Sequence, residues 1–159
     1  MKMSETETQR FLAEPRIARA ASNSPDGFPY LVATWYLYEG GKLFFFCGRA
    51  APRASALEED PRMVFLIDDD HYPYKHVTIC GTGRVEESDS RAAEYIERIC
   101  TRYLGPDAGL KYAESLKESI DPVLITVEVS KLISWDYHTG GYRTKPQGRR
   151  PGGKSGTDG

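Results

Sequence analysis

The segment from Asp26 to Gly83 constrains the fold most, because short apolar runs alternate there with turn residues. An aromatic-rich run covers Phe28 to Tyr38, the pair Gly40-Gly41 reverses the chain, and Lys42 to Cys47 returns. Runs of this length that are rich in aromatic and β-branched residues and bounded by glycine are typical of antiparallel strands joined by hairpins. The chain is therefore expected to be mainly β.

The rest of the chain adds strands and a few short helices to this segment. Further strands are expected at 16–22, 62–67, 75–85, 122–129 and 132–137, and helices at 4–13, 54–59, 89–104 and 107–118. Gly81 and Gly83 fall inside one of these strands, which indicates a barrel bend or a close approach by another body. Antiparallel strands with late helices predict a barrel of about six strands with helices on its flank.

Length and charge limit the class of protein. A chain of 159 residues predicts one domain, here 1–143, and the glycine-rich basic stretch 144–159 is expected to be a disordered, solubilising tail. The net charge of −2 argues against nucleic acid or an anionic membrane as partner. No apolar run approaches the roughly 20 residues of a membrane span, and the N-terminus lacks the apolar core of a signal peptide. A cytoplasmic location is expected.

The residues that could ligate a metal are scattered. The cysteines and histidines are Cys47, Cys80, Cys100, His71, His76 and His138. Their spacing fits reduced buried thiols and predicts no disulfide framework and no metal site. The run Asp68-Asp69-Asp70 lacks the spacing of a calcium loop and is interpreted as a solvated turn.

Arg53 is the strongest candidate for a binding residue. It opens the expected helix 54–59, where free backbone N–H groups favour an anion, and its planar guanidinium suits a phosphate. Arg49 adds a second charge nearby. The alternative is an ion pair between Arg53 and Glu58 or Glu59 on its own helix.

Five short motifs occur in order along the chain. They are Asp-Gly-x-Pro-x-x-Val-x-x-Trp-Tyr from residue 26, Gly-x-Leu-x-Phe from 41, Pro-Arg-x-x-x-Leu-x-x-Asp-Pro-Arg-x-x-x-x-Ile-Asp from 52, Pro-Tyr-x-x-Val-x-x-x-Gly-x-x-x-Val from 73, and Ile-Ser-Trp-Asp-Tyr from 133. This order resembles the pyridoxamine 5'-phosphate oxidase-like flavoprotein superfamily, over about Phe11 to Tyr137. The resemblance implies a six-stranded antiparallel split β-barrel with flanking short helices. It also implies a homodimer that binds FMN, or the deazaflavin coenzyme F-420, at the subunit interface.

The resemblance also assigns cofactor-binding positions. Val32 to Trp35 would lie beside the flavin ring, mainly through backbone groups, and Arg53 would hold the phosphate. His76 would lie near the cofactor, and Trp135 would reach the cofactor of the partner subunit. The full predicted set is Val32, Ala33, Thr34, Trp35, Phe46, Cys47, Gly48, Arg49, Arg53, Ser55, His76 and Trp135, with Phe46 and Cys47 near the ribityl-phosphate.

Several of these residues have a structural alternative. Alternating aromatic residues such as Trp35 are often core, a histidine on a strand such as His76 is often hydrogen-bonded in a structural role, and Trp135 could simply pack in an interface. Tyr74, which follows Pro73 in a loop, could donate to a substrate oxygen or cap the barrel.

Two departures from the family pattern narrow the function. Residues 135–143 lack the Arg-x-His signature of true pyridoxamine-phosphate oxidases, so vitamin B6 oxidation is not expected. Ser55 stands where deazaflavin-binding relatives often carry lysine, which favours FMN over coenzyme F-420.

The sequence thus predicts a flavin- or deazaflavin-dependent oxidoreductase that transfers a hydride between the cofactor and a small organic substrate. No acid, base or nucleophile is assigned, because the cofactor carries the chemistry in such enzymes. The alternatives are a flavin- or haem-binding carrier or sensor without turnover, and a barrel that has lost its ligand.

Overall fold

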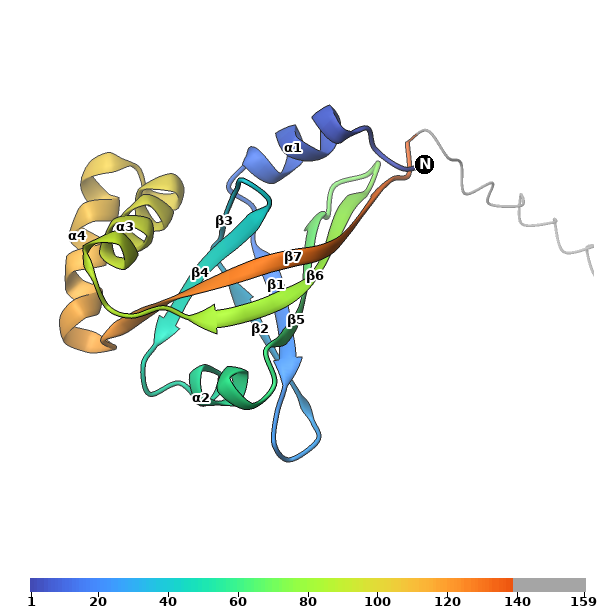
Figure 1. The fold of residues 1–159 in the computed structure, drawn as a ribbon. Coiled ribbons are helices and arrows are strands. Elements are labelled where there is room, and N and C mark those ends of the chain that lie inside the picture. The colour runs from blue at the N-terminus through green and yellow to red at the C-terminus, as the bar shows by residue number, and fades with distance from the viewer. Residues whose placement is uncertain (139–159) are drawn as a thin grey trace, which may run out of the picture.

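The computed structural model describes residues 1–138, so the predicted domain end at 143 and the predicted tail over 144–159 lie outside the described residues. The elements in chain order are α1 (Glu5–Ala13), β1 (Ala18–Asn23), β2 (Pro29–Thr34), β3 (Leu37–Glu39), β4 (Lys42–Gly48), α2 (Pro52–Glu59), β5 (Arg62–Asp69), β6 (Lys75–Val85), α3 (Ser90–Leu104), α4 (Pro106–Ser119) and β7 (Pro122–Asp136) (Figure 1). The four expected helices are all present.

The strands form one antiparallel sheet in the order β2-β1-β5-β6-β7-β4-β3. The sheet has seven strands, so the prediction of six was wrong by one. Two local differences from the expected strands offset each other in number. The run 28–38 breaks at Trp35 and Tyr36 into β2 and β3. The expected strands 122–129 and 132–137 are one long strand, β7, with a register shift opposite Cys80 and Gly81.

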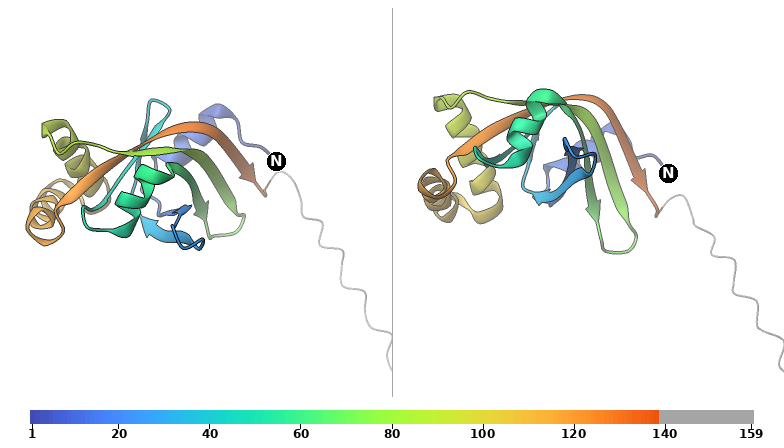
Figure 2. Two further views of the ribbon diagram at one scale, coloured as in Figure 1. Left: turned by 60° about the horizontal axis from the view of Figure 1, so that its bottom comes forward. Right: turned by 90° about the horizontal axis from the view of Figure 1, so that it is seen from below.

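The sheet curls into a half-barrel because its two edge strands are neighbours in sequence. β2 and β3 lie at opposite ends of the strand order, yet only Trp35 and Tyr36 join them. The sheet must therefore bend round, and Figure 2 shows this curvature from two sides. The bend encloses an apolar core that includes Tyr36, Phe45, Phe65 and Ile79, each fully buried.

A split separates β2 from β4. β3 pairs with β4 in a register that sets Leu37 opposite Phe44. Continued backward, this register would set Thr34 opposite Cys47, but β2 pairs with β1 alone. The chain bend at Trp35 and Tyr36 thus leaves the two strands parted, with one side of the split formed by β2 and the other by the end of β4.

The helices cover different parts of the sheet (Figure 1). α1 starts with the predicted capping box, in which the Ser4 hydroxyl accepts from the Glu7 N–H and the Glu7 carboxylate accepts from the Ser4 N–H. α3 and α4 pack on a second apolar cluster that contains Phe44 and Leu124. α2 lies at the end of β4, beside the start of β5.

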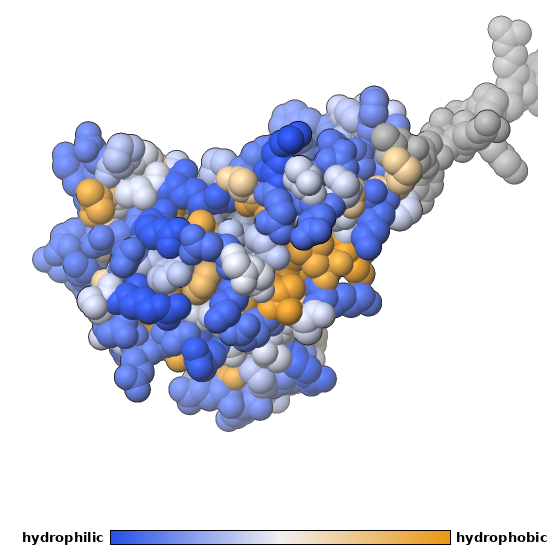
Figure 3. Space-filling view, turned by 45° about the horizontal axis from the view of Figure 1, so that its top comes forward, coloured by the Kyte–Doolittle hydropathy of each residue, from blue (hydrophilic) through white to orange (hydrophobic). Residues whose placement is uncertain are grey.

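The surface is mostly hydrophilic on the face drawn in Figure 3, where apolar side chains gather in one patch. Within residues 1–138, no helix is long and apolar enough to cross a membrane.

Candidate functional site

Arg53 lies at the N-terminus of α2, immediately after the end of β4. Pro52 opens the helix, and Ala51, at the N-cap, offers no side-chain hydrogen bond to the first turn. Because the first backbone N–H groups of a helix have no intrahelical acceptor, this terminus favours an anion. The guanidinium of Arg53 adds a full positive charge in the same place.

The Arg53 side chain is half-buried and has no recorded hydrogen bond or ion pair within the described residues. The alternative pairing with Glu58 or Glu59 is therefore not found. Its charge reaches the buried thiol of Cys47, at the end of β4. Burial raises the pKa of the Cys47 thiol, and the Arg53 charge offsets part of that rise. An unpaired arginine at an uncapped helix terminus is a suitable partner for a phosphate group.

Arg49 is engaged elsewhere. Its Nε donates to the Asp121 carboxylate at 2.6 Å, and a terminal nitrogen donates to the Ser88 hydroxyl at 2.6 Å. These contacts tie the β4–α2 loop to the turn before β7, through Asp121, and to the β6–α3 loop, through Ser88. The carboxylate of Asp121 largely neutralises the Arg49 charge. The pKa of Asp121 is accordingly lowered, first through its hydrogen bond to Arg49.

Two other predicted residues of this region have structural contacts. Gly48 packs closely against Ile120, since a Cβ at this position would lie 3.1 Å from the Ile120 carbonyl oxygen. The Ser55 hydroxyl, on the first turn of α2, donates to the Pro52 carbonyl at 3.0 Å. Both residues still lie close to Arg53 in the chain.

β2 supplies the predicted ring-binding stretch. As an edge strand it keeps one row of backbone N–H and C=O groups unpaired with other strands. The Trp35 side chain turns away toward the helices, where its ring stacks on Tyr103 with centroids 5.0 Å apart and contacts Tyr112 at 5.5 Å. The structural alternative for this side chain is thus found, while the backbone of Val32 to Thr34 lies along the split.

His76 and Trp135 are brought together at the far end of β6 and β7. They are directly paired across the two strands, and both rings approach Tyr137, at 5.9 Å and 6.1 Å. Gly48 pairs with Pro122 at the opposite end of β7. Within one chain, therefore, His76 and Trp135 lie far from the Arg53 group.

The outward face of the sheet carries exposed apolar side chains in two cross-strand rows. Leu31, Ala21, Val64 and Cys80 form one row, and Ala33, Arg19, Leu66, Thr78 and Ile133 form the next. Leu31 is 74% exposed and Leu66 is 37% exposed. The exposed apolar members are Leu31, Val64, Leu66 and Ile133, and they are interrupted by Arg19, which pairs with Asp68, and by Thr78. Exposed apolar groups gathered on one face are typical of an interaction site.

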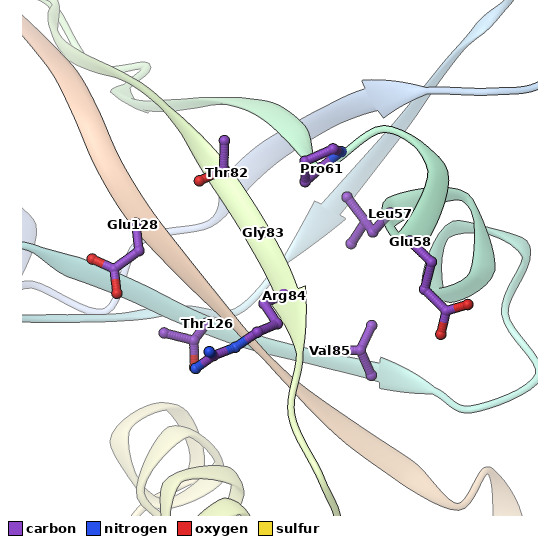
Figure 4. Close-up of a pocket in the computed structure, with 9 residues that line it drawn as sticks. All are labelled: Leu57, Glu58, Pro61, Thr82, Gly83, Arg84, Val85, Thr126 and Glu128. Carbon is purple, nitrogen blue, oxygen red and sulfur yellow. The ribbon is translucent and has the colours of Figure 1, made fainter.

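Among the cavities lined by residues 1–138, two are relevant to the predicted site. One of about 490 Å³ lies between α2 and strands β6 and β7, with Arg84 and Glu128 on its sheet side and Leu57 and Glu58 on its helix side (Figure 4). None of the predicted cofactor residues lines it. Another of about 330 Å³ is lined by His76 together with Asp68, Asp69, Asp70 and Tyr74.

The acidic loop gathers three possible metal ligands, since ligand atoms of Asp69, Asp70 and His71 lie within 4.8 Å of one another. Each is also an ordinary ion-pair partner: His71 contacts both carboxylates at 3.1 Å, and Asp69 also pairs with Arg16 at 3.2 Å. The prediction that no metal binds remains a prediction.

Sequence reasoning missed Tyr103. Its hydroxyl accepts from the Tyr36 N–H at 3.2 Å and donates to the Arg16 carbonyl. Its place on the apolar face of the helix 89–104 was the only available signal, and that pattern does not reveal a bond to a strand 67 residues away.

Comparison with known proteins places these features in a family. A family model described as Pyridoxamine 5'-phosphate oxidase matches residues 4–136. No curated protein sequence matches the chain.

Solved structures share the fold. A conserved hypothetical protein of Mycobacterium tuberculosis, Rv2991, is 26% identical, with a TM-score of 0.74, and the match covers 98% of this chain and 93% of that one. A structure named F420 Reductase is 23% identical, with a TM-score of 0.59 over 78% and 94% of the two chains. HutZ, a haem storage protein of Vibrio cholerae, is 16% identical, with a TM-score of 0.67 over 86% and 97%. The last two are similar in fold alone.

Proposed function

This chain belongs to the pyridoxamine 5'-phosphate oxidase family, and from that premise we propose that it is a flavin- or deazaflavin-dependent oxidoreductase. The reaction would transfer a hydride between the bound cofactor and a small organic substrate. FMN is the first choice of cofactor and coenzyme F-420 the alternative.

The observation that carries this proposal is the half-buried Arg53 at the uncapped start of α2, which has no hydrogen bond or ion pair to any residue of 1–138. Arg53 follows β4, whose end forms one side of the split, after the short β4–α2 loop. A cofactor with a phosphate at one end and a flat ring at the other fits this arrangement, with its phosphate on Arg53 and its ring along the edge of β2. The parted strands leave backbone groups of β2 free to hydrogen-bond to ring heteroatoms.

The protein's own residues would bind and orient, while the cofactor supplies a ring that accepts or gives a hydride. Arg53 and the α2 N–H groups hold the phosphate and so fix the position of the ring along β2. Cys47, buried beside Arg53, excludes water from that end of the site. Orientation of this kind brings donor and acceptor together at low entropic cost.

We further propose that two copies of the chain assemble through the outward sheet face. His76 and Trp135 lie at the other end of β7 from Arg53, so one chain alone gives an incomplete site. The exposed rows around Leu31 and Leu66 continue toward His76 and Trp135, which would place those two residues against the partner. Closed two-fold pairing is the commonest form of homo-oligomer.

The choice of FMN rests on the charges near Arg53. Coenzyme F-420 carries a long anionic tail, and Glu58 and Glu59 lie on the same short helix as Arg53. Arg49, the other nearby cation, is neutralised by Asp121. The charges around Arg53 therefore favour binding of a single compact phosphate over binding of an extended anionic tail. The similarity in fold to an F420 reductase keeps the deazaflavin as the alternative.

The test compares Arg53→Gln with Arg49→Gln while FMN and riboflavin are titrated separately. Loss of a charged hydrogen bond to phosphate should weaken FMN binding by about 10- to 100-fold in Arg53→Gln. Riboflavin, which lacks the phosphate, should bind both variants as it binds the wild type. Arg49→Gln is the matched control and should keep FMN binding. Wild-type FMN affinity in Arg53→Gln would contradict the proposal, and coenzyme F-420 titrated in the same way decides between the cofactors.

A second candidate function is a flavin or haem carrier without turnover. It is favoured by the similarity in fold to a haem storage protein and by the half-buried His76, whose imidazole is a common iron ligand. Haem titration monitored by the Soret band, with His76→Ala as the variant, separates this function from the first. A flavin-loaded protein that neither NAD(P)H nor reduced deazaflavin reduces would also support the carrier.

A further inference from the structure

Tyr103 connects three segments that meet where β2 ends. It lies in the last turn of α3, and its hydroxyl accepts from the Tyr36 N–H at 3.2 Å and donates to the carbonyl of Arg16, just before β1. The face of its ring stacks on Trp35, with centroids 5.0 Å apart and planes within 8° of parallel. One side chain therefore binds both the backbone and the indole of the bend that parts β2 from β3.

The bend needs such support because it has few other bonds. Trp35 and Tyr36 belong to no strand, so their backbone groups lack ladder partners. The Tyr36 hydroxyl is anchored in turn to the carbonyl of Leu12 at 3.0 Å. Tyr36 is fully buried, and a buried backbone N–H is costly to leave without an acceptor. Tyr103 supplies that acceptor from an element 67 residues along the chain.

We infer that Tyr103 is a positioning residue for the cofactor: by fixing the bend at Trp35 and Tyr36, it sets where the open edge of β2 lies. The inference rests on the proposed function, in which the flavin ring lies along that edge. Tyr103 would not touch the cofactor itself. It acts through the backbone of β2, and its stacked contact keeps the Trp35 indole on the helix side, away from the split.

The chain offers a matched control. Tyr112, on α4, contacts the same indole at 5.5 Å but has no hydrogen bond recorded for its hydroxyl within the described residues. Tyr103→Phe and Tyr112→Phe therefore make the same chemical change on two rings that contact Trp35. Only the first removes a bond to the bend.

The experiment measures flavin affinity, the visible absorption of bound flavin, and backbone amide exchange. Tyr103→Phe should weaken both FMN and riboflavin by about tenfold, as expected for one lost buried hydrogen bond, with their ratio unchanged. At saturating FMN, the absorption band should shift, because it reports hydrogen bonds to the ring. A general loss of stability would not produce that shift. Amide exchange at Tyr36 and along β2 should accelerate even without flavin, and Tyr112→Phe should leave all three readouts unchanged.

The outcomes separate the two claims. If the wild type binds FMN and Tyr103→Phe binds it with equal affinity and an unshifted band, the positioning role is wrong and the proposed function stands. If the wild type binds neither FMN nor coenzyme F-420, the proposed function fails and the positioning role fails with it. A weakened FMN affinity with unchanged riboflavin affinity would assign the effect to the phosphate end and would also overturn the inference.

Discussion

Arg49 and Arg53 are four residues apart and differ in whether neighbouring side chains already bind their guanidinium groups. Arg49 has a carboxylate and a hydroxyl within 2.6 Å, whereas Arg53 has no hydrogen bond or ion pair within residues 1–138 and lies near the buried thiol of Cys47. An exposed ion pair such as that of Arg49 contributes little to stability. The half-buried guanidinium of Arg53 says more about function. Partial burial of a charge without a counter-charge is costly, and an anionic ligand would offset that cost.

Two tyrosines at the base of the split are expected to titrate late. Burial raises the pKa of Tyr36 and of Tyr103 above the ordinary value near 10. The neutral phenols are favoured in the folded state, whereas the unfolded chain ionises them at the ordinary pKa. Stability is therefore unaffected by these groups below about pH 10 and falls as the pH rises above it.

Ultraviolet titration of phenolate measures this directly. Alkaline titration of the native protein should show a late step equivalent to two phenols, and Tyr103→Phe should reduce it to one. Ionisation of all ten tyrosines in a single early step, with the fold intact by circular dichroism, would contradict the assignment.

At the scale of elements, β6 shows how two glycines shape a barrel. The sequence predicted a barrel bend or a close approach by another body at Gly81 and Gly83, and the structure shows close approach by neighbouring strands of the same chain at both glycines. The register between β6 and β7 shifts between Cys80 and Gly81. A Cβ at Gly81 would lie 2.3 Å from the Glu128 carbonyl oxygen, while one at Gly83 would first meet the Met63 sulfur at 2.8 Å.

Alanine substitutions in β6 should differ in cost for that reason. Gly81→Ala forces a side chain against backbone at a bulge and should destabilise the fold by about 3 kcal/mol, at the upper end of overpacking effects. Gly83→Ala meets a side chain that can turn away and should cost about 1 kcal/mol. Urea unfolding of the two variants makes the comparison. Equal losses in the free energy of unfolding would show that the β7 backbone moves aside for the added methyl group as easily as the Met63 side chain does.

Element boundaries were predictable where local chemistry sets them. The capping box Ser4-x-x-Glu7 and the glycine pair 40–41 act within a few residues, so helix α1 and the β3–β4 turn were found from sequence. The break at Trp35 and Tyr36 was not. It interrupts a run with good strand propensity, and it exists because distant Tyr103 and Leu12 bind the bend.

At the scale of the whole molecule, the outward sheet face remains to be covered. Its apolar rows lie on strands whose other face is already core, so no further element within residues 1–138 packs on them. A second copy would bury these rows and bring His76 and Trp135 to the site of its partner.

Leu66→Glu tests this assembly, with Leu110→Glu as control. Leu66 lies in the middle of the second row, and Leu110, 50% exposed, lies on α4. Two-fold symmetry would place the new carboxylate in the interface twice. The dissociation constant of the dimer should therefore rise by about 100-fold or more. Light scattering should show a monomer for Leu66→Glu and a dimer for Leu110→Glu. FMN titration should show weakened binding for Leu66→Glu. A monomeric wild type would contradict the two-subunit site.

The strand-rich class, the four helices, the family and Arg53 as a candidate were all predictable from the amino-acid order, because each of these depends on short-range periodicity, capping or motif order. The folded chain was needed to show that Arg49 is paired while Arg53 has no ion pair within residues 1–138. It was also needed to show that the Trp35 indole packs on the helices, and that His76 and Trp135 lie at the far end of β7. These facts arise from contacts between residues far apart in the chain. The pattern of residues over a short stretch of sequence cannot predict such contacts, because the curl of the sheet determines which distant residues meet.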